Sequence, residues 1–148
     1  MPPSVPAPKY PDTAYAASPF VDLTAKRERE RLSPSALRAF FNIVDRWKIR
    51  DEDARTLLGG VSNGPYYNWR KEPKRTLGAD TLLRISYLVG IFKALNILYG
   101  EALADEWVRL PNTNRIFAGH TPLDYMKAGG IPALQTVRRL LDARRGGA

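Results

Sequence analysis

The sequence contains no cysteine and only one histidine, His120. Without cysteine the chain has no disulfide framework, no thiolate ligand for zinc and no thiol nucleophile. The clustered acids at 51–53 stand at the start of a predicted helix, and one histidine adds too few ligands for a metal site. We therefore predict that the protein holds no metal.

Catalytic motifs are also scarce. Gly59 and Gly64 have the spacing of a phosphate-binding loop, but Pro65 and Tyr66 follow where lysine and a hydroxyl residue are required. His120 lies in a polar turn, where a structural or solvent-facing role outweighs that of a general base. We predict no catalytic residues, no cofactor and no enzymatic activity.

No segment indicates export or membrane insertion. The start MPPSVPAPKYP lacks the charged region and apolar core of a signal peptide. The longest apolar stretch, residues 82–99, is interrupted by Arg84, Lys93 and Asn96, whereas a membrane span needs about 20 mostly apolar residues. We expect this stretch to be a buried helix and the protein to be cytoplasmic.

Acidic residues are outnumbered, so the formal net charge is +8 and the isoelectric point is about 10.0. A basic surplus of this size is typical of proteins that bind nucleic acids. It also occurs in proteins that dock onto acidic protein partners. Charge alone leaves both possibilities open.

Half of the twelve prolines lie in the first 22 residues, which show no regular apolar period. We interpret residues 1–31 as a flexible arm, although its charged end at 25–31 also fits the first turns of a helix. The rest of the chain has helical periodicity and no strand period. We predict an all-α fold, with one domain at 32–100 and a second at 101–148.

Start and stop signals place the individual helices. Ser33 as N-cap and Pro34 as the first helical residue predict a helix start, with large apolar residues following to Trp47. Glycine pairs at 59–60 and 129–130 predict helix ends, and residues 121–124 form a capping box. The remaining helices are expected over residues 51–58, 63–72, 80–99, 101–110, 122–128 and 132–145.

Residues 51–75 have the pattern of a helix-turn-helix. Ala54 is the small residue of the first helix, residues 59–61 form the turn, and Tyr66 and Trp69 face inward from the second helix. On its other face, amides and guanidinium groups suit base edges and lysines suit phosphates. The alternative is a helical hairpin with a solvated basic face. The predicted DNA-binding residues are Ser62, Asn63, Tyr67, Asn68, Arg70, Lys71, Lys74 and Arg75.

From Ala54 onward the sequence resembles the Xre/MbcA/ParS antitoxins. ARTLLGGVSNGPYYNWRKE resembles their Xre-type helix-turn-helix, and LLRISYLVGIFKALNILYG resembles their connecting helix. EWVRLPNTNRIFAGHTPLDYMKAGG and a final helix ending LLDARRGG resemble their toxin-binding domain. The order of the following residues carries the resemblance: Trp107, Pro111, Asn112, Phe117, Gly119, Thr121, Pro122, Leu123, Asp124 and Gly129.

The resemblance implies a type II antitoxin whose partner is a RES-domain toxin that degrades NAD. It implies that the C-terminal end closes the toxin's NAD pocket, that the antitoxin forms a homodimer, and that the complex binds its own promoter DNA. Arginines beside a glycine-rich end suit a cleft lined with carboxylates; alternatively they only complement a helix C-terminus. The implied toxin-binding residues are Arg138, Arg139, Arg144, Arg145, Gly146 and Gly147.

Two other functions fit the same residues. The chain could be a stand-alone transcription regulator whose C-terminal domain only dimerises. It could also be an RNA-binding adaptor that stacks bases on Tyr66, Tyr67 and Trp69, although Tyr66 and Trp69 have the spacing of core residues.

Overall fold

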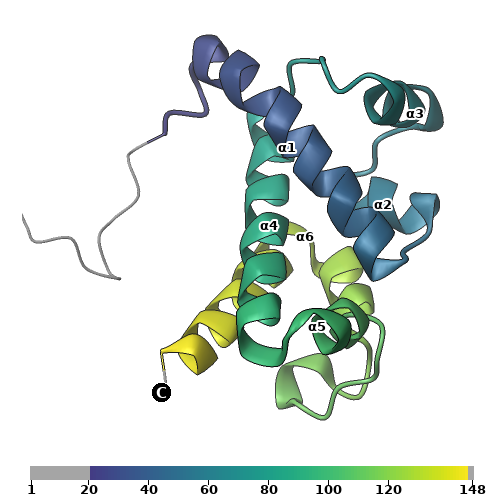
Figure 1. Cartoon of the computed structure of the whole chain (residues 1–148), viewed down its shortest axis with the longest axis vertical. Coiled ribbons are helices and arrows are strands. Elements are labelled where there is room, and N and C mark those ends of the chain that lie inside the picture. Colours follow the sequence, from purple (N-terminus) through teal and green to yellow (C-terminus); the bar gives the residue numbers. More distant parts are fainter. Residues whose placement is uncertain (1–20, 147–148) are drawn as a thin grey trace, which may run out of the picture.

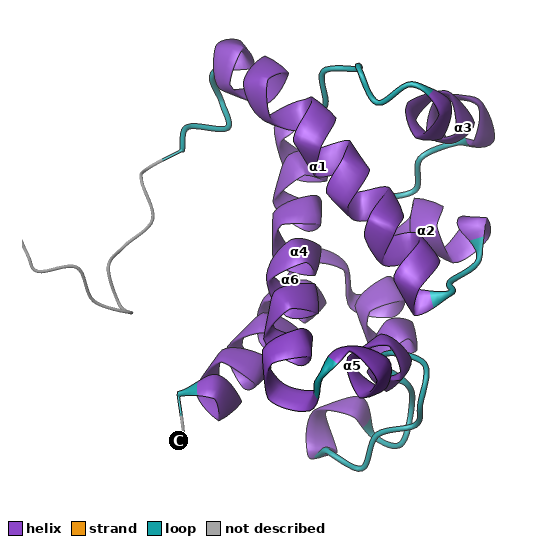
Figure 2. Cartoon of the chain, viewed as in Figure 1, coloured by secondary structure: helices purple, strands orange, loops and turns teal. Residues whose placement is uncertain are grey.

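The computed structural model describes residues 21–146, and the only regular elements in this part of the chain are helices, joined by loops and turns (Figures 1 and 2). This confirms the predicted all-α fold for the described residues. The helices follow one another in the order α1 (Lys26–Trp47), α2 (Asp51–Leu57), α3 (Asn63–Lys71), α4 (Ala79–Tyr99), α5 (Glu101–Trp107), a 3-10 helix η1 (Arg115–Phe117) and α6 (Pro122–Arg145).

The first helix begins earlier than predicted. Helix α1 starts at Lys26, so Ser33 lies inside the helix and is not its N-cap. Ser33 is fully buried; its hydroxyl donates to the carbonyl oxygen of Arg29 (2.5 Å) and accepts the N–H of Leu77 (2.9 Å). These two bonds satisfy the buried hydroxyl, although Ser33 followed by proline has the local sequence signature of an N-cap. Residues 26–31 therefore belong to α1, and residues 1–20 of the predicted arm lie outside the described part.

Helix α4 is the centre of the fold, and α1, α5 and α6 all pack on it (Figure 1). Leu88, Ile91 and Leu95 on its inner side are completely buried. By length and composition alone α4 could cross a membrane. Its contacts with three other helices instead fit the predicted core helix, and Ile97 on its outer side is 64% exposed.

The helix-turn-helix lies on one side of α4. Ala54 of α2 is fully buried, as expected of the small residue in the first helix. Gly59 and Gly60 follow α2 with φ angles of 101° and 88°, which L side chains rarely adopt, so the predicted helix stop is confirmed. A side chain at Gly59 would also be crowded, because an added Cβ atom would lie 3.2 Å from Nε of Arg84 in α4.

Helix α6 consists of two parts. The hydroxyl of Thr121 accepts the N–H of Asp124 (3.0 Å) and Pro122 opens the helix, which confirms the predicted N-terminal cap. Gly130 has φ 63° and ψ −146°, so the helical path breaks at the predicted stop. In Figure 1 the first part lies to the right of α4, and the second passes behind α4 and ends at the lower left.

Candidate DNA-binding and toxin-binding surfaces

Helix α3 is attached to the core through Tyr66, which is completely buried. Its ring meets the ring of Phe41 edge-on at 5.4 Å, and its hydroxyl donates to a carboxylate oxygen of Asp51 at 2.6 Å. Burial and the Asp51 carboxylate both raise the pKa of the Tyr66 phenol. Tyr66 therefore fixes α3 against α1 and α2, and it offers no face on which an RNA base could stack.

Arg70 differs most from the sequence prediction, which placed it on the DNA-facing side of α3. Its guanidinium forms a short ion pair with Asp45 and a longer one with Asp51 (3.6 Å), and it lies 5.3 Å from the centre of the Phe41 ring. Arg70 therefore connects α3 to α1 and α2. A single sequence gives no sign of these acidic partners, since Asp45 is 25 residues away.

Tyr67 is exposed to solvent but also bonded to the fold. Its side chain is 49% exposed, yet its hydroxyl donates to Asp51 at 3.1 Å. The Asp51 carboxylate raises the pKa of the Tyr67 phenol, so the neutral hydroxyl is the form that persists. About half of the Tyr67 surface is therefore available to a partner while its hydroxyl is held by Asp51.

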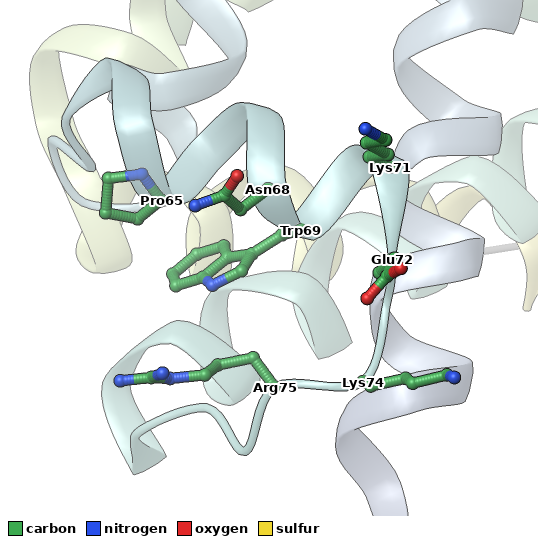
Figure 3. Close-up of a pocket in the computed structure, with 7 residues that line it drawn as sticks. All are labelled: Pro65, Asn68, Trp69, Lys71, Glu72, Lys74 and Arg75. Atoms are coloured by element: carbon green, nitrogen blue, oxygen red, sulfur yellow. The ribbon is translucent and has the colours of Figure 1, made fainter.

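The other predicted DNA-binding residues of α3 and the following loop are exposed, and Arg70 is exposed as well. Ser62 precedes α3 in the N-cap position, but its hydroxyl makes no cap hydrogen bond. An open hollow of about 630 Å³ lies at the end of α3. Figure 3 shows the indole of Trp69 in its middle, with Arg75 extending below it. The hollow is lined by Pro65, Asn68, Trp69, Lys71, Glu72, Lys74 and Arg75.

Three basic residues of this surface have no ion pair in the described part of the chain, as is also true of Lys93 and Arg139 elsewhere. Lys71, Lys74 and Arg75 have no acidic partner within 4.0 Å among the described residues, whereas Arg46, Arg70 and many other arginines do. Cations without an internal partner remain available to an external anion. The residues around Trp69 thus have the composition of a nucleic-acid contact surface.

The motif Gly60-Val61-Ser62-Asn63-Gly64 also has the Gly-x-Ser-x-Gly spacing of a hydrolase nucleophile elbow. That motif works only in a sharp turn from a strand to a helix, which exposes the serine above a sheet. Here Ser62 lies in a turn between α2 and α3. The spacing therefore belongs to the helix-turn-helix and does not indicate a nucleophile.

Of the C-terminal arginines, one packs against the fold, Arg138, and three are exposed, Arg139, Arg144 and Arg145. Arg138 packs across α4: a Cβ atom at Gly90 would lie 1.3 Å from its Nη1, and its Nε donates to Asp142 at 2.9 Å. Arg139 is exposed, without an ion pair in the described part of the chain. Arg144 donates to the hydroxyl of Tyr99 (2.7 Å). Arg145 lies 4.0 Å from Asp142, Gly146 follows the helix, and Gly147 lies outside the described residues.

Comparison with known proteins identifies two domains in the chain. Residues 29–90 match the antitoxin Xre-like helix-turn-helix domain, and residues 94–147 match the antitoxin Xre/MbcA/ParS C-terminal toxin-binding domain. The chain belongs to the Xre/MbcA/ParS antitoxin family. A relative from Sinorhizobium fredii, named uncharacterized protein y4oB, is 43% identical over 115 residues, which cover 77% of this chain and 87% of the relative.

The antitoxin therefore combines a DNA-binding helix-turn-helix with a domain that binds a toxin. The matched domains meet at residues 90–94, inside α4, so both share this helix as their core. This explains why no linker interrupts the helical pattern.

One contact between the domains has no counterpart in the sequence prediction. Asp53 of α2 is buried, and its carboxylate accepts a hydrogen bond from Lys127 of α6 at 2.7 Å and lies 3.4 Å from Arg50. Burial by itself raises the pKa of Asp53, but the hydrogen bonds and charges of Lys127 and Arg50 outweigh it, so the pKa lies below its ordinary value. In the sequence, Asp53 indicates only the start of a helix.

His120 occupies the turn before α6. Its backbone N–H donates to Phe117 and its carbonyl accepts the N–H of Asn112. Its exposed side chain borders a hollow of about 270 Å³ beside Phe117 and Tyr125. No group of three potential metal ligands occurs among the residues the structure describes.

Proposed function

We propose that this antitoxin neutralises a RES-domain toxin that degrades NAD, and that it does so with the second part of α6. The family match supports a toxin partner, and the resemblance of the sequence indicates the toxin class. The observation that carries the proposal is the end of α6: Leu141 is its last buried side chain, and Arg144, Arg145 and Gly146 beyond it are exposed. An exposed basic end can enter a cleft without unfolding the domain behind it.

The arginine side chains at the end of α6 suit such a cleft chemically. Arg139 and Arg145 have weak or no internal partners, and the single strong contact of Arg144 is a neutral hydroxyl. Arginine binds carboxylates in a bidentate manner, so these groups suit an active site whose acidic residues handle a dinucleotide. The end of the chain would exclude NAD by occupying its pocket.

We also propose that the antitoxin represses its own operon by binding promoter DNA, and that it works in the cytoplasm. The exposed basic residues around Trp69 support DNA contact, with Asn63 and Asn68 directed at bases and Lys71, Lys74 and Arg75 at phosphates. Arg70 is not part of this set, because Asp45 and Asp51 hold it.

We further propose that the antitoxin forms a homodimer. An apolar groove of about 460 Å³ between α1 and α4, lined by Leu32, Ala36, Ile85 and Val89 among others, supports pairing with a second copy. Val89→Lys would then give a monomer in light scattering, whereas Ile97→Lys, on the exposed side of the same helix, would leave the dimer intact. A dimeric Val89→Lys variant would place the interface elsewhere.

The deciding experiment is genetic neutralisation. The neighbouring open reading frame is expressed alone and together with this protein, while growth and cellular NAD are followed. Growth arrest with loss of NAD, reversed by co-expression, is the expected result. Toxicity without NAD loss would identify another toxin class, and a harmless neighbour would favour a stand-alone regulator whose C-terminal domain only dimerises.

A further inference from the structure

The early start of α1 brings a second group of basic residues beside the loop at 72–78. Lys26 and Arg29 of α1 line an open hollow of about 620 Å³ together with Lys74, Arg75 and residues 76–78; Glu30 also borders it. Lys74 and Arg75 border the hollow around Trp69 as well. The two hollows therefore adjoin through one loop, and basic side chains continue from α3 to the start of α1.

The loop is held in this position by a buried contact. The N–H of Leu77 donates to the hydroxyl of Ser33, and the same hydroxyl donates to the carbonyl of Arg29. Leu77 and Ser33 are both buried. This connection fixes Lys74 and Arg75 against the turn of α1 that carries Arg29, so the arrangement is set before any partner binds.

The side chains of the loop diverge. Figure 3 shows Arg75 extending below the indole of Trp69, while Lys74 extends in the opposite direction; the second hollow places Lys74 with Lys26 and Arg29. One cation thus faces the α3 side and the other faces the α1 side.

Charge is available on both sides of the loop. The side chain of Lys26 is 76% exposed and lies 3.8 Å from Glu30, a distance at which a surface pair contributes little. The Nη1 of Arg29 donates to the carbonyls of Leu23 and Thr24, so its positive charge is held in place without an acidic partner. Lys74 has no ion pair among the described residues.

We propose that Lys26, Arg29 and Lys74 form a binding site for the sugar-phosphate backbone of DNA, so that the start of α1 is part of the DNA interface. The ligand is the phosphodiester chain of the strand next to the bases that α3 reads. This rests on the proposed DNA binding and extends it to residues outside the helix-turn-helix. Such contacts fix the position of the protein on the duplex and are insensitive to base sequence.

The test measures affinity as a function of salt. The full-length protein is titrated against a labelled duplex from directly upstream of its gene and against a random duplex of equal length. Lys26→Ala, Lys74→Ala and the double variant are compared with Lys93→Ala, which removes an equal charge from an exposed position on α4. The slope of log affinity against log salt is negative, and removing one phosphate-binding cation lowers its magnitude by about 0.9.

The expected result is a shallower slope for Lys26→Ala and Lys74→Ala, about twice the change for the double variant, equal weakening on both duplexes and no change for Lys93→Ala. Circular dichroism checks that each variant is folded. Lys71→Ala, on α3, is titrated in the same way. Unchanged slopes for Lys26→Ala and Lys74→Ala beside a shallower slope for Lys71→Ala would overturn this phosphate-binding site and leave DNA binding intact. Failure of the wild-type protein to bind either duplex would overturn DNA binding itself.

Discussion

The ammonium nitrogen of Lys127 lies 2.7 Å from a carboxylate oxygen of Asp53, and this ion pair joins α6 of the toxin-binding domain to α2 of the helix-turn-helix. Asp53 is 6% exposed and the side chain of Lys127 is 24% exposed, so solvent screens the pair only in part. A contact of this kind holds the two functional surfaces in one relative position.

Lys127→Ala is expected to lower the free energy of unfolding by about 2 kcal/mol, because it leaves a buried carboxylate with Arg50 as its only cation. The cost stays below the roughly 3–5 kcal/mol of a fully buried pair because Arg50 remains. Denaturant unfolding measures the change. Lys93→Ala is the control, and equal stability of the two variants would show that the pair contributes nothing.

The same carboxylate gives a pH dependence. Because the pKa of Asp53 is lower in the folded protein than in the unfolded chain, its stabilisation is fully present above the ordinary aspartate pKa of about 3.9 and is lost as the pH falls through the folded value. Asp53→Asn should therefore flatten the dependence of unfolding free energy on pH below about 4. Glu72→Gln removes an exposed carboxylate and is the control; identical slopes in wild type and Asp53→Asn would contradict the assignment.

Arg70 and Lys71 are neighbours with opposite expected roles. Arg70→Ala should destabilise the protein by about 1 kcal/mol, since it removes the ion pairs with Asp45 and Asp51, which solvent screens in part, and the contact with the Phe41 ring. Lys71→Ala should change stability by less than about 0.5 kcal/mol and lower the magnitude of the salt slope of DNA binding by about 0.9. Thermal unfolding and DNA titration of both variants check this. A stable Arg70→Ala variant with a reduced salt slope would return Arg70 to the DNA surface.

The contrast between Arg70 and Lys71 also indicates how much of the structure can be predicted from the sequence. Helical period, caps and glycine stops depend on residues a few positions apart, and they correctly predict the helix-turn-helix, the Thr121 cap and the break at Gly130. Asp45, Lys127 and Leu77, the distant partners of Arg70, Asp53 and Ser33, lie 25 or more positions away along the chain, so these bonds exist only once the helices pack. For the same reason the Ser-Pro pair inside α1 has the local signature of a helix start although the helix begins at Lys26.

Gly130 should be sensitive to any side chain. Its φ of 63° with ψ of −146° is a conformation almost confined to glycine, so Gly130→Ala is expected to cost about 1–3 kcal/mol. Gly64 provides the matched control, because it lies in α3 with open space around its Cα, and Gly64→Ala should stabilise by up to about 1 kcal/mol. Calorimetry compares the two. Equal melting temperatures would mean that the break in α6 is not fixed by Gly130.

The proposed inhibition by the C-terminal end makes the last prediction. Deleting residues from Arg144 onward removes exposed side chains beyond Leu141, so the shortened antitoxin should fold normally and still bind its toxin. It should protect cells poorly, because the NAD pocket would stay open. The variant with both Arg144→Ala and Arg145→Ala keeps the backbone and separates the role of charge from that of length. Binding is followed by calorimetry and protection by growth and NAD content. Full protection by the shortened antitoxin would show that the toxin is inhibited through another surface, whereas loss of binding would make the end a binding element and not a plug.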